Sequence, residues 1–148
     1  MEALDLIEIH QLLGQYGHIV DAGEWHRFDE LFTEDAVLDY TGVRVPEVLH
    51  GRDAIVEFFG SANHPSAHHV TNIVVSEEDG DVCVHSKFLA PYTRPSHEPR
   101  RWYGGDYHDV VVRTPDGWRF TRRACIARWL LTPEIAGGEA TPEHRRTR

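Results

Sequence analysis

Residues 6–20 repeat hydrophobic positions with the period of an α-helix. Intervals of three and four residues separate the hydrophobic positions, which predicts an amphipathic helix with one buried face. The hydrophobic positions are Leu6, Ile9, Leu13, Tyr16 and Val20. Gly23 suits the end of this helix, because glycine readily adopts the left-handed conformation of a C-terminal cap. Residues 25–32 predict a second, short helix, residues 36–40 a strand, and residues 50–60 a third helix that ends at Gly60.

After residue 66 the pattern changes to that of β-strands. Four segments are rich in β-branched and aromatic residues, and turn sequences containing Gly, Pro or Asp separate them. They cover residues 67–76, 81–92, 102–114 and 118–131. Helices first and long antiparallel strands afterwards predict an α+β fold, with the N-terminal helices packed in the concave face of a strongly curved β-sheet. We predict one domain over residues 1–136 and a flexible tail over residues 137–148, where no hydrophobic period remains.

Composition narrows the class of protein. The 148 residues fit one domain, and the net charge of −9 with scattered arginines predicts no nucleic-acid partner. No apolar run approaches the roughly 18 residues that a membrane span needs. The first residues, MEALDLIEIHQLL, lack the basic region of a secretory signal. Cys83 and Cys125 are predicted to be reduced core residues of a cytoplasmic protein, with a single disulfide as the alternative.

Asp21 stands out because it lies where the hydrophobic face of the first helix ends. Gly17 and Gly14 precede it by four and seven residues on the same flank. Helical side chains lean toward the N-terminus, so the carboxylate is expected to lie over Gly17, where no side chain blocks it. Each interior glycine costs about 1 kcal/mol relative to alanine. Two of them therefore indicate either space for the carboxylate or close packing of another element. An ordinary solvated residue at a helix end is the simpler interpretation of Asp21.

The segment SAHHVTN, residues 66–72, contains the second candidate. Adjacent strand residues point to opposite faces of a sheet, so only one of His68 and His69 can share a pocket with Asp21. Both faces of this strand contain apolar residues, so the pattern does not choose between the two histidines. A strand histidine that makes only structural hydrogen bonds is the alternative to a catalytic one.

Eleven histidines call for a test of metal binding. The candidate ligands are His64, His68, His69, His85, His97 and His108. The sequence contains neither HExxH nor Cys-x-x-Cys, so we predict no metal. It also contains no GxGxxG, GxSxG or P-loop motif, and we predict no cofactor. Gly104 and Gly105 are expected to mark a bulge in a bent strand, and Asp109 is expected to pair with a strand arginine.

Three features together resemble a known superfamily. They are an Asp soon after the first amphipathic helix, a His-x-x-x-Asn pattern on the first long strand, and D-G-W-R-F on a late strand. This pattern resembles the SnoaL-like branch of the nuclear transport factor 2-like superfamily over residues 3–132. The resemblance implies a cone-shaped α+β barrel with a mixed sheet. The chain is also similar to scytalone dehydratase, hexachlorocyclohexane dehydrochlorinase and a bile-acid dehydratase, in which an Asp–His pair performs acid–base elimination without a cofactor.

The resemblance implies a set of site residues. Asp21 and His68 match the acid–base pair, and Asn72 matches the Asn of the motif and is expected to bind substrate. Stabilisation of developing negative charge falls to Arg128, Tyr16 and Tyr40. The alternative for Arg128 is a surface ion pair, and the alternative for both tyrosines is a plain core role. The aromatic residues predicted to form the substrate pocket are Trp25, Phe58, Phe88 and Trp102.

These features predict a cofactor-independent lyase or isomerase that acts on a small apolar cyclic substrate. A neutral imidazole accepts a proton, and an ionised carboxylate orients it and stabilises the imidazolium. A polyketide-cyclase-like or epoxide-opening enzyme, with Asp21 as base and His68 as acid, is the first alternative. A non-catalytic ligand-binding domain is the second, because fold does not determine function. The exposed outer face of a curved sheet predicts a homodimer or homotrimer.

Overall fold

A computed structural model of the chain describes residues 1–92 and 101–132. The predicted tail, residues 137–148, and most of the proline-containing turn before the third long strand lie outside the described residues. So does His97, one of the histidines considered as a metal ligand.

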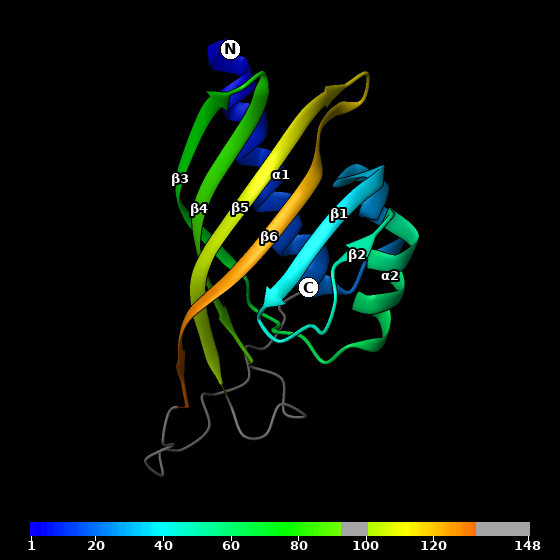
Figure 1. Cartoon of the computed structure of the whole chain (residues 1–148), viewed down its shortest axis with the longest axis vertical. Coiled ribbons are helices and arrows are strands. Elements are labelled where there is room, and N and C mark those ends of the chain that lie inside the picture. Colours follow the sequence, from blue (N-terminus) through cyan, green and yellow to red (C-terminus); the bar gives the residue numbers. More distant parts are fainter. Residues whose placement is uncertain (93–100, 133–148) are drawn as a thin grey trace, which may run out of the picture.

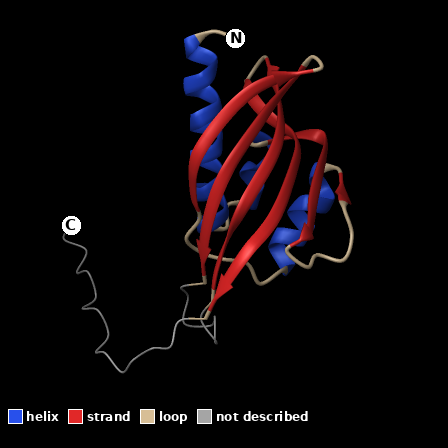
Figure 2. Cartoon of the chain, turned by 60° about the vertical axis from the view of Figure 1, so that its left-hand side comes forward, coloured by secondary structure: helices blue, strands red, loops and turns tan. Residues whose placement is uncertain are grey.

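The first helix forms as the hydrophobic pattern predicts. Helix α1 spans Ala3–Ala22 and buries Ile9, Leu13, Tyr16 and Val20. Gly23 caps its C-terminus with φ 71°, and its N–H donates to the carbonyl of Val20 over 3.1 Å. The helix crosses the inner side of the sheet along most of its length (Figure 2).

Two shorter helices follow, and a very short strand lies between them. The segment η1, Trp25–Glu30, is a 3-10 helix, and α2 spans Arg52–Ser61. Strand β2 consists only of Leu49–His50 and was not predicted. It pairs with the long strand β1, Phe32–Gly42, and so holds α2 beside that strand.

The remaining strands are close to their predicted limits. They are β3 (His69–Glu78), β4 (Asp81–Pro91), β5 (Trp102–Thr114) and β6 (Gly117–Leu131). With β1 and β2 they form one sheet in the order β2-β1-β6-β5-β4-β3. Only β1 and β6 run parallel, so the sheet is mixed. It curves strongly and stays open between β2 and β3 (Figure 1). The predicted α+β fold with a helix in the concave face of a curved mixed sheet is confirmed.

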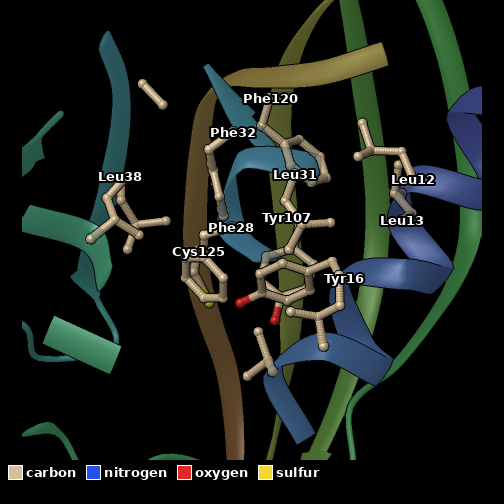
Figure 3. Close-up of a cluster of buried hydrophobic side chains, with 14 of the residues drawn as sticks. Leu12, Leu13, Tyr16, Phe28, Leu31, Phe32, Leu38, Tyr107, Phe120 and Cys125 are labelled. Carbon is tan, nitrogen blue, oxygen red and sulfur yellow. The ribbon is translucent and has the colours of Figure 1, made fainter. Parts of the chain in front are cut away.

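The core fills the space between α1 and the concave face. Tyr16 from α1 and Tyr107 from β5 meet at its centre, below Phe32 and Phe120 (Figure 3). Tyr16 makes edge contacts with these three rings at centroid distances of 6.0–6.4 Å. Aromatic pairs in this arrangement stabilise a core beyond the area that they bury.

Register shifts in the pairing of β5 with β6 and of β3 with β4 change which residues face inward. The register shifts between Gly104 and Gly105, so a bulge lies at the predicted place, but the extra residue is Arg128 on the partner strand β6. A second shift lies between Val110 and Val111, where β6 carries one extra residue. A third lies between Thr71 and Val74 on β3. An extra residue reverses the alternation of side chains along a strand.

Both cysteines are free thiols, as predicted, and Cys125 is buried. Within residues 1–92 and 101–132, no helix is both long and apolar enough to cross a membrane.

Candidate active site

Asp21 and His68 form a close hydrogen-bonded pair. The ring Nδ1 of His68 lies 2.6 Å from Asp21 Oδ1, and the backbone N–H of His68 donates to Asp21 Oδ2 over 2.8 Å. An ionised carboxylate only accepts hydrogen bonds, so beside ionised Asp21 the proton of a neutral His68 ring belongs on Nδ1. The other ring nitrogen, Nε2, is then free to accept a proton. The side chain of His68 is 5% exposed and that of Asp21 26%.

Gly17 permits this approach. A Cβ at position 17 would lie 3.2 Å from the carbonyl oxygen of His68 and 3.6 Å from its Cβ. The backbone before β3 can therefore approach α1 closely, one turn before Asp21. Of the two interpretations of the glycines, close packing applies at Gly17, whereas a Cβ at Gly14 would meet nothing within 4 Å. His69 is exposed, so His68 is the histidine that faces inward.

The ring of His68 also lines a mostly aromatic cavity of about 120 Å³ at the end of the sheet beside α2. Its walls come from β1, α2, β4, β5, β6 and the segment before β3. The lining residues used below are Tyr40, Phe58, Phe59, Phe88, Tyr107 and Cys125. An apolar cavity of roughly 150 Å³ is large enough for benzene. The cavity beside His68 is somewhat smaller than this and partly open, so we compare it with ligands of one ring.

Two tyrosines form the polar part of this region. The hydroxyls of Tyr16 and Tyr40 are 2.6 Å apart, and Tyr40 lines the cavity whereas Tyr16 lies behind it. Burial raises the pKa of Tyr16 and raises that of Tyr40 further. Both hydroxyls therefore keep their protons at neutral pH and can donate hydrogen bonds.

An arginine that the sequence did not single out lies behind the tyrosines. Arg123 on β6 is fully buried, and it forms two hydrogen bonds of 2.8 Å with the buried Asp109 on β5. Its guanidinium carbon lies 4.0 Å from the ring centroid of Tyr16 and 4.2 Å from that of Tyr107. The expected pairing of Asp109 with a strand arginine is confirmed. The sequence pattern does not distinguish Arg123 from the exposed arginines of the same strand, because the register shift in β6 depends on its pairing with β5.

The structure brings some of the predicted wall residues to the cavity and leaves others outside. Phe58 and Phe88 line it. Trp25 packs behind the lining, tilted against Phe59 and in edge contact with His64, with ring centroids 5.8 and 5.1 Å away. The position predicted for Trp102 needs correction. Trp102 is the first residue of β5, is 39% exposed and does not line the cavity.

The predicted positions of Arg128 and Asn72 also need correction. Arg128 is 58% exposed and donates to Asp106 over 2.5 Å, away from the cavity, so its alternative of an ion pair applies. Asn72 is exposed, with φ 51°, and accepts a hydrogen bond from the hydroxyl of Thr71. The bulge between Thr71 and Val74 removes Asn72 from the face that strict alternation shares with His68.

The cavity has two further properties that bear on its chemistry. Burial raises the pKa of Cys125, so this residue presents a thiol and not a reactive thiolate. Within the described part of the chain, no three His, Cys, Asp or Glu side chains are arranged to hold a metal ion.

With this geometry in view, comparison with known sequences identifies the family. Residues 1–124 match the SnoaL-like domain. The chain belongs to this family. It is also 31% identical over 138 residues to the anthranilate 1,2-dioxygenase small subunit of Burkholderia cepacia, and the match covers 80% of this chain and 84% of that protein.

Two solved structures from Novosphingobium aromaticivorans have the same fold. One is provisionally named an aromatic ring hydroxylase. It has a TM-score of 0.75 and 27% identity, and the match covers 90% of this chain and 96% of that one. The other is provisionally named a scytalone dehydratase. It has a TM-score of 0.73 and 23% identity, and the match covers 93% of this chain and 96% of that one. These likenesses support the nuclear transport factor 2-like fold, whose members include dehydratases, cyclases and ligand-binding proteins.

Proposed function

We propose that this SnoaL-like protein is a cofactor-independent lyase or isomerase that acts on a small, mostly apolar cyclic compound. The observation that carries the proposal is the 2.6 Å contact between His68 Nδ1 and Asp21, with the same imidazole lining an aromatic cavity. A buried base beside an ionised orienting group is an arrangement suited to abstraction of a proton from carbon.

The proposed reaction begins with transfer of a proton from substrate carbon to Nε2 of His68. The carbon–hydrogen electron pair moves toward an adjacent carbonyl and leaves an enolate oxygen, while Asp21 stabilises the imidazolium. A hydrogen bond from Tyr40 stabilises the enolate. In elimination, the enolate re-forms the carbonyl, a carbon–carbon double bond forms, and the leaving group on the next carbon departs with its bonding pair. In isomerisation, the imidazolium returns the proton to a different carbon.

Two alternatives use the same cavity. In a cyclase-like or epoxide-opening reaction Asp21 would be the base and His68 the acid. In a non-catalytic role the domain would bind a ligand or support a partner subunit, and the similarity to a dioxygenase small subunit favours this alternative. Turnover by the isolated protein separates it from the enzymatic proposals.

The decisive experiment screens hydroxylated cyclic ketones and halogenated rings against the wild type, His68→Ala and Asp21→Asn. We expect His68→Ala to lower kcat/KM by about 10²–10⁴, the usual contribution of a positioned general base. His69→Ala is the matched control, because this neighbouring imidazole is exposed and should not affect turnover. Equal turnover by wild type and His68→Ala would remove His68 from the proposed role.

We also propose that the protein is cytoplasmic, forms a homodimer or homotrimer, and binds neither nucleic acid nor a cofactor. Large apolar side chains remain exposed on the single chain and favour self-association. Among them are Val74, Val112, Trp129 and Leu131, which are 40–61% exposed.

A further inference from the structure

We propose that Arg123, together with Asp109, is a positioning residue that strengthens the hydrogen bond donated by Tyr16 to Tyr40, so that Tyr40 presents its hydroxyl hydrogen to a ligand oxygen in the cavity. The inference deepens the proposed function and rests on it for the role of the ligand oxygen. The direction of the hydrogen bond follows from the contacts of Tyr16 alone.

Tyr16 is completely buried. Its relative exposure is 0%, and rings surround it at centroid distances of 5.9–6.4 Å. Among the described residues the acceptor for its hydroxyl hydrogen is Tyr40, 2.6 Å away, since the neighbouring Arg123 carries only donors. A buried hydroxyl hydrogen without an acceptor is costly. Tyr16 must therefore donate to Tyr40, since the reverse direction would leave the hydroxyl hydrogen of Tyr16 without an acceptor.

Tyr40 can direct its own hydroxyl hydrogen into the cavity, because it lines that cavity. Once Tyr40 accepts the hydrogen bond from Tyr16, its hydrogen can point only toward the open space. A ligand oxygen placed there meets a donor that a second donor has already polarised. The site thus favours a ring that carries a carbonyl or similar acceptor oxygen over a purely hydrocarbon ring.

Arg123 holds Tyr16 in this role. Its guanidinium faces the rings of Tyr16, Tyr107 and Phe120, with its carbon 4.0–4.2 Å from their centroids. Asp109 binds Nε and Nη2, whereas Nη1 has no hydrogen-bond partner among the described residues. Nη1 and the face of the guanidinium are thus left to the aromatic cluster. A cation beside a phenol strengthens the phenol as a hydrogen-bond donor.

The test removes the charge without leaving a buried ion. Arg123→Met alone would leave the buried carboxylate of Asp109 without its partner. The informative protein is therefore the double variant Arg123→Met/Asp109→Leu, in which hydrophobic residues replace the pair. Arg122→Met is the matched control, because the adjacent Arg122 is 52% exposed on the opposite face. Circular dichroism and thermal melting establish that each variant is folded.

The first readout needs no ligand. A buried, hydrogen-bonded tyrosine hydroxyl proton exchanges slowly with water, and Tyr16→Phe assigns its NMR resonance. We expect the resonance in the wild type and in Arg122→Met, and an upfield shift or loss in the folded double variant. An unchanged Tyr16 resonance in the double variant would overturn the role of Arg123.

The second readout uses cyclohex-2-enone as a one-ring carbonyl probe. We expect its carbonyl stretch to move to lower frequency on binding to the wild type. In Tyr40→Phe that shift should vanish and the affinity should fall about tenfold, the loss of one neutral hydrogen bond. The double variant should show a smaller shift. His68→Ala should keep the wild-type shift even though it loses turnover, which separates failure of this inference from failure of the proposed reaction. Absence of the shift in the wild type would overturn the donor role of Tyr40.

Discussion

At the scale of single residues, Asp106 shows how a buried carboxylate on the outer face of the sheet stabilises the fold. It is 2% exposed and accepts hydrogen bonds from Lys87, Arg128 and His85. The hydrogen bonds from Lys87 and then Arg128 hold its pKa well below the ordinary value for aspartate. Its ionised form is therefore favoured more strongly in the folded chain than in the unfolded one.

The sign of this pKa shift predicts the pH dependence of stability. Because the folded pKa is depressed, the stabilisation is fully present above the unfolded pKa of about 3.9 and is lost as the pH falls toward the folded value. We expect Asp106→Asn to lower the free energy of unfolding by about 1–2 kcal/mol near pH 6. The difference from wild type should shrink at pH 3. Urea unfolding at both pH values measures it.

Asp81→Asn is the matched control for Asp106, because Asp81 is an exposed carboxylate at the start of β4. We expect this control to match wild type at both pH values. A difference between Asp106→Asn and wild type that stays constant from pH 6 to pH 3 would contradict the assigned cause.

Residue identity alone predicted part of the site. Asp21 could be proposed from a carboxylate at the end of a hydrophobic face, whereas the choice of His68 over His69 came from the resemblance to the superfamily. Arg123 could not be proposed, because four arginines follow one another within ten residues of β6 and strict alternation does not single it out. The extra residue near Thr121 turns Arg123 inward behind Phe120 and leaves Arg122 outside. Such a shift depends on the partner strand, so no single-strand pattern contains it.

At the scale of elements, the contact between α1 and the segment before β3 determines the site geometry. Gly17→Ala should push the carbonyl of His68 away, since the added Cβ would lie only 3.2 Å from that oxygen. We expect kcat/KM to fall or, if no substrate is known, the His68 ring NMR signals to shift. Stability should change little, because the gain in helix propensity of about 1 kcal/mol offsets the strain.

Gly14→Ala tests whether the effect depends on position. Nothing lies within 4 Å of the added Cβ, so this variant should gain up to about 1 kcal/mol of stability and leave the His68 signals unchanged. Equal effects of the two alanines on His68 would show that the Gly17 contact does not position the pair.

The elements themselves were largely predictable, and the exceptions have local causes. The long periodic segments gave α1 and the four long strands within a few residues of their limits. Strand β2 has only two residues, and it exists because Val37 and Leu38 offer it a partner. Asn72 was placed on the wrong face because a bulge interrupts the alternation of β3. Pairing between distant segments decides both features, and the hydrophobic period of one segment does not record it.

At the scale of the whole molecule, the cavity results from the open, curved shape of the sheet. The helix α1 fills most of the concave face and leaves a cavity beside α2, where aromatic rings from several elements converge. A second, wider hollow of about 410 Å³ lies between α1 and the start of β3 and includes Asp21 and His68 in its lining. The cavity beside α2 has a volume of about 120 Å³, close to that of one ring. Polar groups reach it mainly from His68 and the tyrosines, so both the size and the chemistry of a ligand are constrained.

The volume of the cavity gives a prediction about the size of the ligand that it binds. The wild type should bind cyclohex-2-enone, which has one ring, and should bind 2-tetralone, which has two, at least about tenfold more weakly, because one clash of about 1.4 kcal/mol suffices for that factor. Phe58→Ala should reverse this preference. Phe58 lines the cavity from α2 and is only partly buried, so its truncation opens space at a moderate cost in stability.

Trp102→Ala removes an aromatic ring outside the cavity and should leave both affinities as in the wild type. Titration calorimetry of the two ketones measures the preference. Equal binding of both ketones to wild type and Phe58→Ala would mean that the space beside His68 does not select the ligand, and a one-ring substrate would then lose its support.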